Sequence, residues 1–200
     1  ILADPDRAPT IVDVTPHTVQ QGEVAHVVVR GRNLGLTEAA DLGPGIDVSI
    51  VSLIAVNNET GAVNDLATLT EVVREVAPAA VVHTDAVQAM SWIDVAEMAA
   101  DVDLVSITGH KLGGPTGTGA LFVRQGVVLE AQILGGGQER GRRAGTPDVA
   151  GAAAFAAAVE VTVAERDAEI RRLGALRDRL LAGLSHRLGA TMRPTVAKPG

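Results

Sequence analysis

From residue 48 onward, short apolar runs alternate with segments of helical period, and this alternation is the strongest constraint on the fold. Residues 48–56 form a nearly continuous apolar run, which is typical of a buried parallel strand. Further strands are predicted at 79–83, 102–107 and 119–123. A helix capped by Asp65 is predicted from apolar positions at 66, 69, 73 and 76 that share one face, and a short helix is predicted at 93–100. Strands that alternate with helices predict an α/β layer with a mainly parallel sheet flanked by helices.

The two ends of the chain differ from this middle part. Residues 1–47 contain glycines and short β-branched runs at 10–14 and 24–29, which predict a β-rich segment. From residue 149 to about 188 the pattern is helical, and the acidic and basic residues in its second half indicate a solvated face. We therefore expect a β-rich segment at 1–47, an α/β domain at 48–150, and a long helix with the start of a small C-terminal domain at 151–200.

The overall charge and the absence of cysteine exclude several classes of protein. The formal net charge of −7 argues against a nucleic-acid or anionic-membrane partner. No apolar run reaches the roughly 20 residues that span a bilayer, and no export signal is visible, so a cytoplasmic location is expected. The chain contains no cysteine, which excludes disulfides, thiolate metal sites and a cysteine nucleophile. It begins with Ile1 rather than Met, and we expect it to be a fragment.

Polar clusters follow three of the predicted strands. Residues 57–61 follow the first strand, residues 83–88 the second, and residues 108–111 the third. In an open parallel sheet, ligands bind beyond the carboxyl ends of the strands, so we expect these clusters to meet at one crevice. Each cluster also has a simpler interpretation: the first as a turn and helix cap, Asp85 as a helix N-cap, and His110 as a hydrogen-bonded loop residue.

Lys111 stands out because only two of the 17 basic residues other than histidine are lysines. A guanidinium stays protonated and is a poor nucleophile, whereas a desolvated lysine amine can lose its proton and form a Schiff base. A surface lysine in a glycine-rich turn is the alternative. Together with Asp85, which could pair with a protonated pyridine nitrogen, Lys111 predicts a site for pyridoxal 5'-phosphate.

Other polar residues can complete such a site. Asn58 and Gln88 could hydrogen-bond the phenolic oxygen of the ring, and Thr108 and His110 could contact the phosphate or orient the imine. The glycine- and arginine-rich run at 135–146 offers backbone amides and guanidinium groups that suit an anion.

Two other kinds of site are not supported by the spacing of residues. The glycine-rich run at 113–119 lacks the G-x-x-x-x-G-K-[ST] order of a P-loop and does not lead directly into a helix. The five histidines and the acidic residues show no H-E-x-x-H or comparable metal spacing.

Residues from about 48 to 188 resemble the cysteine desulfurases, which are pyridoxal-phosphate enzymes of the class V aminotransferase group. The resemblance rests on four motifs whose order and spacing match, and it covers about 70% of the chain; the motifs are residues 56–61, 83–88, 106–111 and 135–146. It implies part of the large domain of fold type I, acting as a homodimer.

The resemblance also implies roles for single residues. Lys111 matches the Schiff-base lysine, and Asp85 matches the partner of the pyridine nitrogen. Thr146 matches a residue that reaches the phosphate of the partner subunit's cofactor. Four further positions match cofactor contacts, of which the last is also expected to be catalytic with Lys111: Asn58, Gln88, Thr108 and His110.

The family removes sulfur from L-cysteine as a persulfide and leaves alanine, which supplies sulfur for iron–sulfur clusters or thio-cofactors. The resemblance therefore implies an L-cysteine-like substrate and a sulfur-acceptor protein.

The chain departs from the family pattern in several places. The family's N-terminal segment supplies a phosphate-binding threonine and a ring-stacking histidine, and neither is found here. The family's catalytic cysteine and substrate-binding arginine lie beyond residue 200, so we expect a truncated and impaired enzyme that cannot form a persulfide on this polypeptide. Leu134 stands where many members have histidine and Thr116 where many have lysine, two changes that we expect to be tolerated.

Alternative interpretations remain open at this point. Another class V enzyme, such as a selenocysteine lyase or an aminotransferase, would share the same motifs, although the run at 135–146 favours a desulfurase. A non-catalytic remnant or interaction module is the alternative from a different class. Residues 1–47 resemble an immunoglobulin-like repeat of the IPT/TIG type, and a frameshifted or mis-joined start is the other interpretation.

Overall fold

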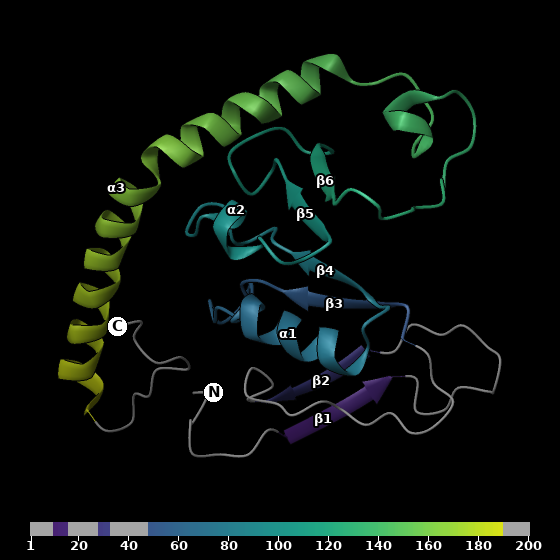
Figure 1. Cartoon of the computed structure of the whole chain (residues 1–200). Helices are drawn as coiled ribbons and strands as arrows, with labels where there is room; N and C mark the ends of the chain where they lie inside the picture. Colours follow the sequence, from purple (N-terminus) through teal and green to yellow (C-terminus); the bar gives the residue numbers. More distant parts are fainter. Residues whose placement is uncertain (1–9, 16–27, 33–47, 190–200) are drawn as a thin grey trace.

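The main body of the molecule is a four-stranded sheet in the order β3–β4–β5–β6 (Figure 1). The computed structural model describes residues 10–15, 28–32 and 48–189. The strands are β3 (Ile50–Ile54), β4 (Val81–Asp85), β5 (Leu104–Thr108) and β6 (Gly119–Val123). The first three are parallel, and β6 is antiparallel to β5, so the predicted α/β class with a mainly parallel sheet is confirmed.

The register of the sheet places the carboxyl ends of the parallel strands together. Ile54, the last residue of β3, pairs with Asp85, the last residue of β4. Asp85 in turn pairs with Ser106 near the end of β5. The antiparallel strand β6 begins at the same edge, because Gly119 pairs with Thr108. We call this the carboxyl edge of the sheet, and the opposite edge the amino edge.

Helix α1 (Leu66–Val76) packs on one face of the sheet and begins where the sequence predicts. The side chain of Asp65 caps it by accepting a hydrogen bond from the Thr68 backbone N–H at 3.2 Å. Leu66 and Val73 of this helix belong to the same buried cluster as Val82 of β4. Because this cluster consists mainly of alanine and valine side chains, the chain builds its core almost without aromatic residues.

Helix α2 (Val95–Met98) is shorter than the predicted segment at 93–100. Asp94 accepts hydrogen bonds from the backbone N–H groups of Ala96 and Glu97, so it fixes the start of the helix two residues later than predicted. Ala99 has φ −103° and ψ 21°, which ends the helix. The prediction of a helix at this place is confirmed, but its length is wrong.

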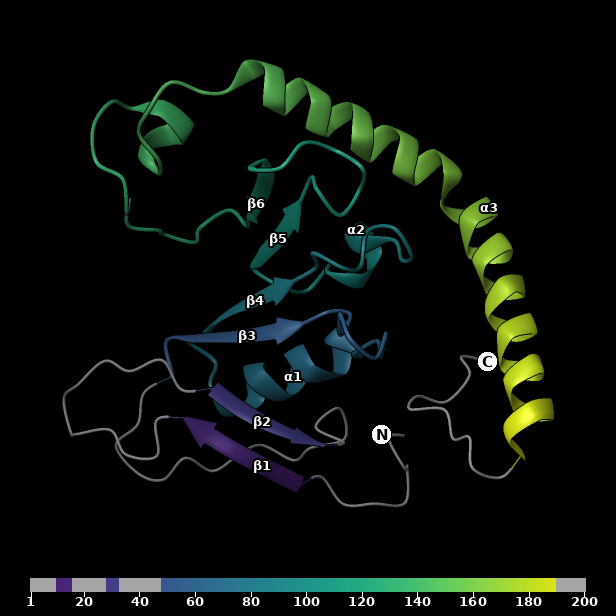
Figure 2. The ribbon, with the colours of Figure 1, turned by 180° about the vertical axis from the view of Figure 1, so that it is seen from behind.

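Helix α3 (Val149–Leu188) has 40 residues and agrees with the predicted helical segment. It begins after the cap Asp148 and ends at Gly189, whose φ is 57°. Figures 1 and 2 show it as one long, curved helix that runs along the side of the sheet past α2. Arg166 fixes this position, because its guanidinium donates to the Met90 carbonyl at 3.2 Å and lies 3.5 Å from the Asp94 carboxylate.

Two short strands, β1 (Thr10–Thr15) and β2 (Val28–Arg32), form a separate antiparallel pair. The first agrees closely with the predicted strand at 10–14, and the second lies further along the chain than the predicted 24–29. The other residues of the 1–47 segment lie outside the described residues, so the boundaries proposed at 47 and 150 remain predictions. A 3-10 turn, η2 (Gln138–Gly141), lies in the loop before α3.

Candidate functional site at the carboxyl edge of the sheet

Asp85 is the last residue of strand β4, whereas the sequence predicted that it lies in the loop after this strand. The predicted strand ended at residue 83, but β4 continues to Asp85 because that residue pairs with both Ile54 and Ser106. One carboxylate oxygen, Oδ1, accepts a hydrogen bond from the Val87 backbone N–H at 3.0 Å. A turn follows, and α2 begins only at Val95, so the alternative of a helix N-cap is wrong.

The loop that carries Lys111 has a well-defined backbone. The Gly109 N–H donates to the Thr118 carbonyl at 2.9 Å, and the Gly109 carbonyl accepts from Leu112 and Gly114 at 2.9 and 3.0 Å. A Cβ atom at Gly109 would collide with the Thr118 side chain, which explains the glycine. Lys111 itself is exposed, and its amine has no hydrogen bond or ion pair to any described residue. The loop therefore fixes the backbone of Lys111 and leaves the amine available.

The structure brings together Thr108 and His110. The Thr108 hydroxyl lies 2.9 Å from Nδ1 of His110, and it donates to the Thr118 carbonyl at 3.2 Å. A hydroxyl has only one proton, so when that proton goes to the carbonyl, the Nδ1–H of His110 donates to Thr108. In the neutral ring this leaves Nε2 as an acceptor at the exposed end of the side chain. The pair could thus accept or relay a proton at the carboxyl edge.

Asn58 and Gln88 lie in the turns that follow β3 and β4, at the same edge. The turn after β3 is built by Asn57, whose side-chain oxygen accepts from the backbone N–H groups of Glu59 and Thr60 at 3.0 and 2.9 Å. Asn58 is exposed, and Gln88 is half-buried. Neither forms a hydrogen bond with another candidate residue in the described part of the chain. The candidate residues therefore lie at the same edge, as predicted, but Asn58 and Gln88 do not contact the others through hydrogen bonds.

Thr146 lies apart from the other candidates. It is exposed, two residues before the helix cap Asp148, in the loop that contains η2. In this loop Glu139 and Arg140 adopt φ values of 49° and 58°, a conformation that is uncommon outside glycine. Within residues 48–189, Thr146 contacts none of the other candidates through a hydrogen bond. The expected contact with a partner subunit's cofactor remains a prediction.

Sequence reasoning missed a row of side chains on the sheet beside Asp85. His83 of β4 lies between Ser52 of β3 and Ser106 of β5, with 2.7 Å from Nδ1 to the Ser52 hydroxyl and 2.7 Å from Nε2 to the Ser106 hydroxyl. A signal existed in the sequence, since a polar residue stands in the middle of each of the three strands: Ser52, His83 and Ser106. The signal could be interpreted only with the strand register, which the sequence does not supply.

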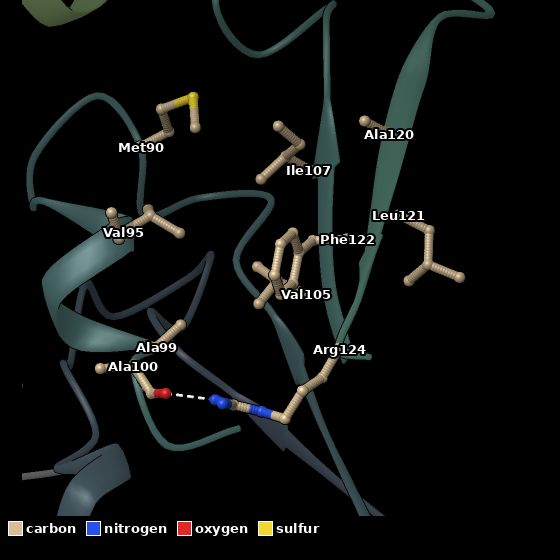
Figure 3. Close-up of a pocket in the computed structure, with 11 residues that line it drawn as sticks. Met90, Val95, Ala99, Ala100, Val105, Ile107, Ala120, Leu121, Phe122 and Arg124 are labelled. Atoms are coloured by element: carbon tan, nitrogen blue, oxygen red, sulfur yellow. Dashed lines mark hydrogen bonds between the residues drawn. The ribbon is translucent and has the colours of Figure 1, made fainter. Parts of the chain in front are cut away.

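A hollow of about 690 Å³ lies elsewhere, between α2 and the strands β5 and β6 (Figure 3). None of the seven candidate residues lines it. Figure 3 shows mostly apolar side chains around it, including Val105, Ile107 and Phe122. Arg124 supplies the one guanidinium of the lining and donates to the Ala100 carbonyl. Because this lining has few polar groups, we assign the candidate site to the carboxyl edge and not to the hollow.

The described residues contain no group of three or more histidine, cysteine or acidic side chains that could hold a metal ion. No helix among them is both long and apolar enough to cross a membrane.

Comparison with known proteins gives a family match over most of the chain. The model of the family described as "Aminotransferase class-V" matches residues 18–199. This match begins before residue 47, the boundary that the sequence pattern predicts.

Individual relatives agree with that match. A cysteine desulfurase from Gluconacetobacter diazotrophicus is 46% identical over 141 residues, which are 70% of this chain and 35% of the relative. Among solved structures, a NifS-like protein is 36% identical with a TM-score of 0.66, and covers 72% of this chain and 40% of that one. DndA from Streptomyces lividans is 37% identical with a TM-score of 0.63, covering 72% of this chain and 41% of DndA. The chain thus spans about a third of the length of the curated relatives it matches, and the expected partial fold type I domain is confirmed.

Proposed function

This chain belongs to the aminotransferase class-V family, and from that premise we propose that it binds pyridoxal 5'-phosphate at the carboxyl edge of its sheet as part of a cysteine desulfurase. The observation that carries the proposal is the position of Asp85 at the end of β4, next to the ordered loop that presents Lys111. The identities of 36% and 37% to the NifS-like protein and DndA, each over 72% of this chain, support the proposal.

The side chains at this edge fit the chemistry of the cofactor. One oxygen of Asp85 accepts from Val87, and the other, Oδ2, has no hydrogen bond to a described residue, so it can accept from a protonated ring nitrogen. The unpaired amine of Lys111 can hold the cofactor covalently. Pyridoxal phosphate, when bound, supplies an electron sink for bonds at the α-carbon of an amino acid.

The remaining candidate residues would bind the cofactor and orient it. Asn58 and Gln88 offer amide groups at the turns after β3 and β4, which suit a phenolic oxygen. Thr108 orients the His110 ring through the 2.9 Å bond to Nδ1, so that Nε2 would hold or move a proton at the edge. The arginines near Thr146 would favour an anionic group. An L-cysteine-like substrate, a homodimer and a sulfur-acceptor protein remain predictions of the resemblance, and a cytoplasmic location remains a prediction from the sequence pattern.

Cofactor binding is the decisive property to measure, since these 200 residues contain no cysteine and sulfur transfer on this chain offers no readout. The full chain would be dialysed against pyridoxal phosphate, as the wild type and as Lys111→Ala. We expect the substitution to weaken binding by about tenfold or more, because it removes the covalent contribution. The matched control is Lys198→Ala, which removes the chain's other lysine and should leave the affinity unchanged.

Two outcomes would contradict the proposal. Wild-type chain that binds no more cofactor than Lys111→Ala would exclude Lys111 as the anchor. An equal loss of affinity in Lys111→Ala and Lys198→Ala would show that the cofactor reacts with lysines in general and not at this edge.

A further inference from the structure

Ser52, His83 and Ser106 form a hydrogen-bonded row across three parallel strands. Both ring nitrogens of His83 are engaged at 2.7 Å, Nδ1 by Ser52 on β3 and Nε2 by Ser106 on β5. The order of these strands can be followed in Figure 1. A histidine with both nitrogens bonded to neighbouring strands has a fixed ring plane, and it is rigid in the same way as the sheet that carries it.

Asp85 lies on the same face of the sheet as this row. Successive residues of a strand point to opposite faces, and Val82 and Thr84 are fully buried in the core beneath α1. His83 and Asp85, two residues apart, therefore both point to the other face. Ser106 connects them, because it pairs with Asp85 in the strand register and hydrogen-bonds His83 through its hydroxyl.

The surroundings of His83 favour its neutral form. Burial lowers the pKa of His83, and the nearby Asp85 carboxylate raises it by less, so the pKa lies below its ordinary value. Ser52 and Ser106 are uncharged and can each donate or accept, so either neutral tautomer is satisfied. In the described part of the chain, Asp85 is the charged group that acts on His83.

We propose that His83 is a positioning residue for Asp85: held between Ser52 and Ser106, its uncharged ring leaves the full negative charge of Asp85 to the bound cofactor. This inference rests on the proposed function. A charged His83 would compensate Asp85 and repel a protonated ring nitrogen at the same carboxylate. Because coupling between two sites is reciprocal, the charge of His83 and the occupancy of Asp85 influence each other equally.

The coupling between His83 and Asp85 can be measured without any cofactor. The ring of His83 would be titrated by NMR in the full chain, as the wild type and as Asp85→Asn. Since the Asp85 carboxylate raises the pKa of His83, its removal should lower that pKa further. Asp94→Asn is the matched control, because Asp94 caps α2 and pairs with Arg166 instead. An unchanged His83 pKa in Asp85→Asn would overturn the inference.

The effect on the cofactor needs a second measurement. The dissociation constant of pyridoxal phosphate would be measured between about pH 5 and pH 8 for the wild type and His83→Asn. His83 becomes charged as the pH falls through its pKa, so wild-type affinity should fall there by about fivefold relative to the variant. Asparagine keeps hydrogen-bonding capacity without a titrating charge, and the ratio of the two constants removes the cofactor's own titration. His186→Asn, in the last turn of α3, is the control.

The outcomes separate this inference from the proposed function. Binding at Lys111 with a constant ratio between wild type and His83→Asn at every pH would give His83 a merely structural role and overturn the inference alone. No binding by the wild type at any pH would overturn the proposed function, and the inference with it. A ratio that changes through the pKa of His83, with His186→Asn identical to wild type, supports the inference.

Discussion

The two edges of the sheet use an aspartate in opposite ways. At the amino edge, Asp103 accepts from the Val82 backbone N–H at 2.8 Å and from Arg74 at 2.6 Å, with Arg124 at 3.7 Å from its other oxygen. At the carboxyl edge, Asp85 has a single bond to Val87 and one oxygen without a partner in the described residues. At the amino edge the polar groups stabilise the fold by bonding to one another. At the carboxyl edge they remain available to bind a ligand.

The electrostatics agree with this division. Burial alone would raise the pKa of Asp103, but the Val82 N–H and the guanidinium groups of Arg74 and Arg124 outweigh it and lower the pKa. Arg74 also connects α1 to the start of β4, since it donates to the Ala80 carbonyl at 2.8 Å. The division teaches that a carboxylate held by a backbone N–H and two guanidinium groups indicates a structural role, whereas a carboxylate with a single hydrogen bond at a sheet edge indicates a binding role.

The largest expected effect on stability comes from breaking the amino-edge network. Asp103→Ala removes the carboxylate that accepts from the Val82 N–H and that pairs with two guanidinium groups, and we expect a loss of about 2 kcal/mol in the free energy of unfolding. This value is set below that of a fully buried pair, because the side chains of Arg74 and Arg124 are 37% and 43% exposed. Urea unfolding measures it.

Asp85→Ala is the matched variant at the other edge. It removes one bond in a turn, so we expect a loss of less than about 1 kcal/mol. If Asp85→Ala destabilised the chain as much as Asp103→Ala, the functional difference between the two edges would be contradicted.

A smaller change in the free energy of unfolding is expected when the pH is lowered. The lowered pKa of Asp103 means that its contribution to stability is present above the unfolded value, about 4, and is lost as the pH falls through the folded value. The stability difference between wild type and Asp103→Asn should therefore shrink between pH 5 and pH 2, as measured by urea unfolding at each pH. Other carboxylates titrate equally in both proteins and cancel. A difference that stayed constant would show that the charge of Asp103 is not what stabilises the amino edge.

The smallest effect is expected outside both edges. Glu169 and Arg172 form an exposed ion pair on α3 at 2.6 Å, and solvent screens such pairs strongly. Glu169→Gln should leave both the thermal unfolding midpoint and cofactor affinity unchanged within error. A clear loss of either would mean that α3 contributes to the site more directly than its contacts indicate.

Much of the fold followed from the sequence, because local patterns determined it. The apolar runs located β3 and β6, and Asp65 predicted the start of α1. The limits of α2 were wrong, because the positions of Asp94 and Ala99 depend on backbone geometry that the apolar pattern does not contain. The end of β4 was missed because Asp85, a poor strand former, is held in the sheet by pairing with its neighbours.

The candidate site could be predicted in composition but not in arrangement. Lys111 and Asp85 were identifiable from residue type and motif order. That Thr108 orients His110, and that His83 is held by Ser52 and Ser106, depends on contacts between residues up to 31 positions apart. The contacts of His83 are set by the strand register, and the contact of Thr108 with His110 by the conformation of the loop after β5. Neither can be deduced from the identity of the single residues.

The proposed anchoring at Lys111 can be tested by locating the lysine to which pyridoxal phosphate attaches. The full chain would be incubated with pyridoxal phosphate, reduced with borohydride and digested, and the labelled peptide would be identified by mass spectrometry. We expect the cofactor mass on the peptide that contains Lys111, and a smaller labelled fraction in Asp85→Asn. Label on Lys198 or on the N-terminal amine alone, with Lys111 unmodified, would contradict the proposed anchoring.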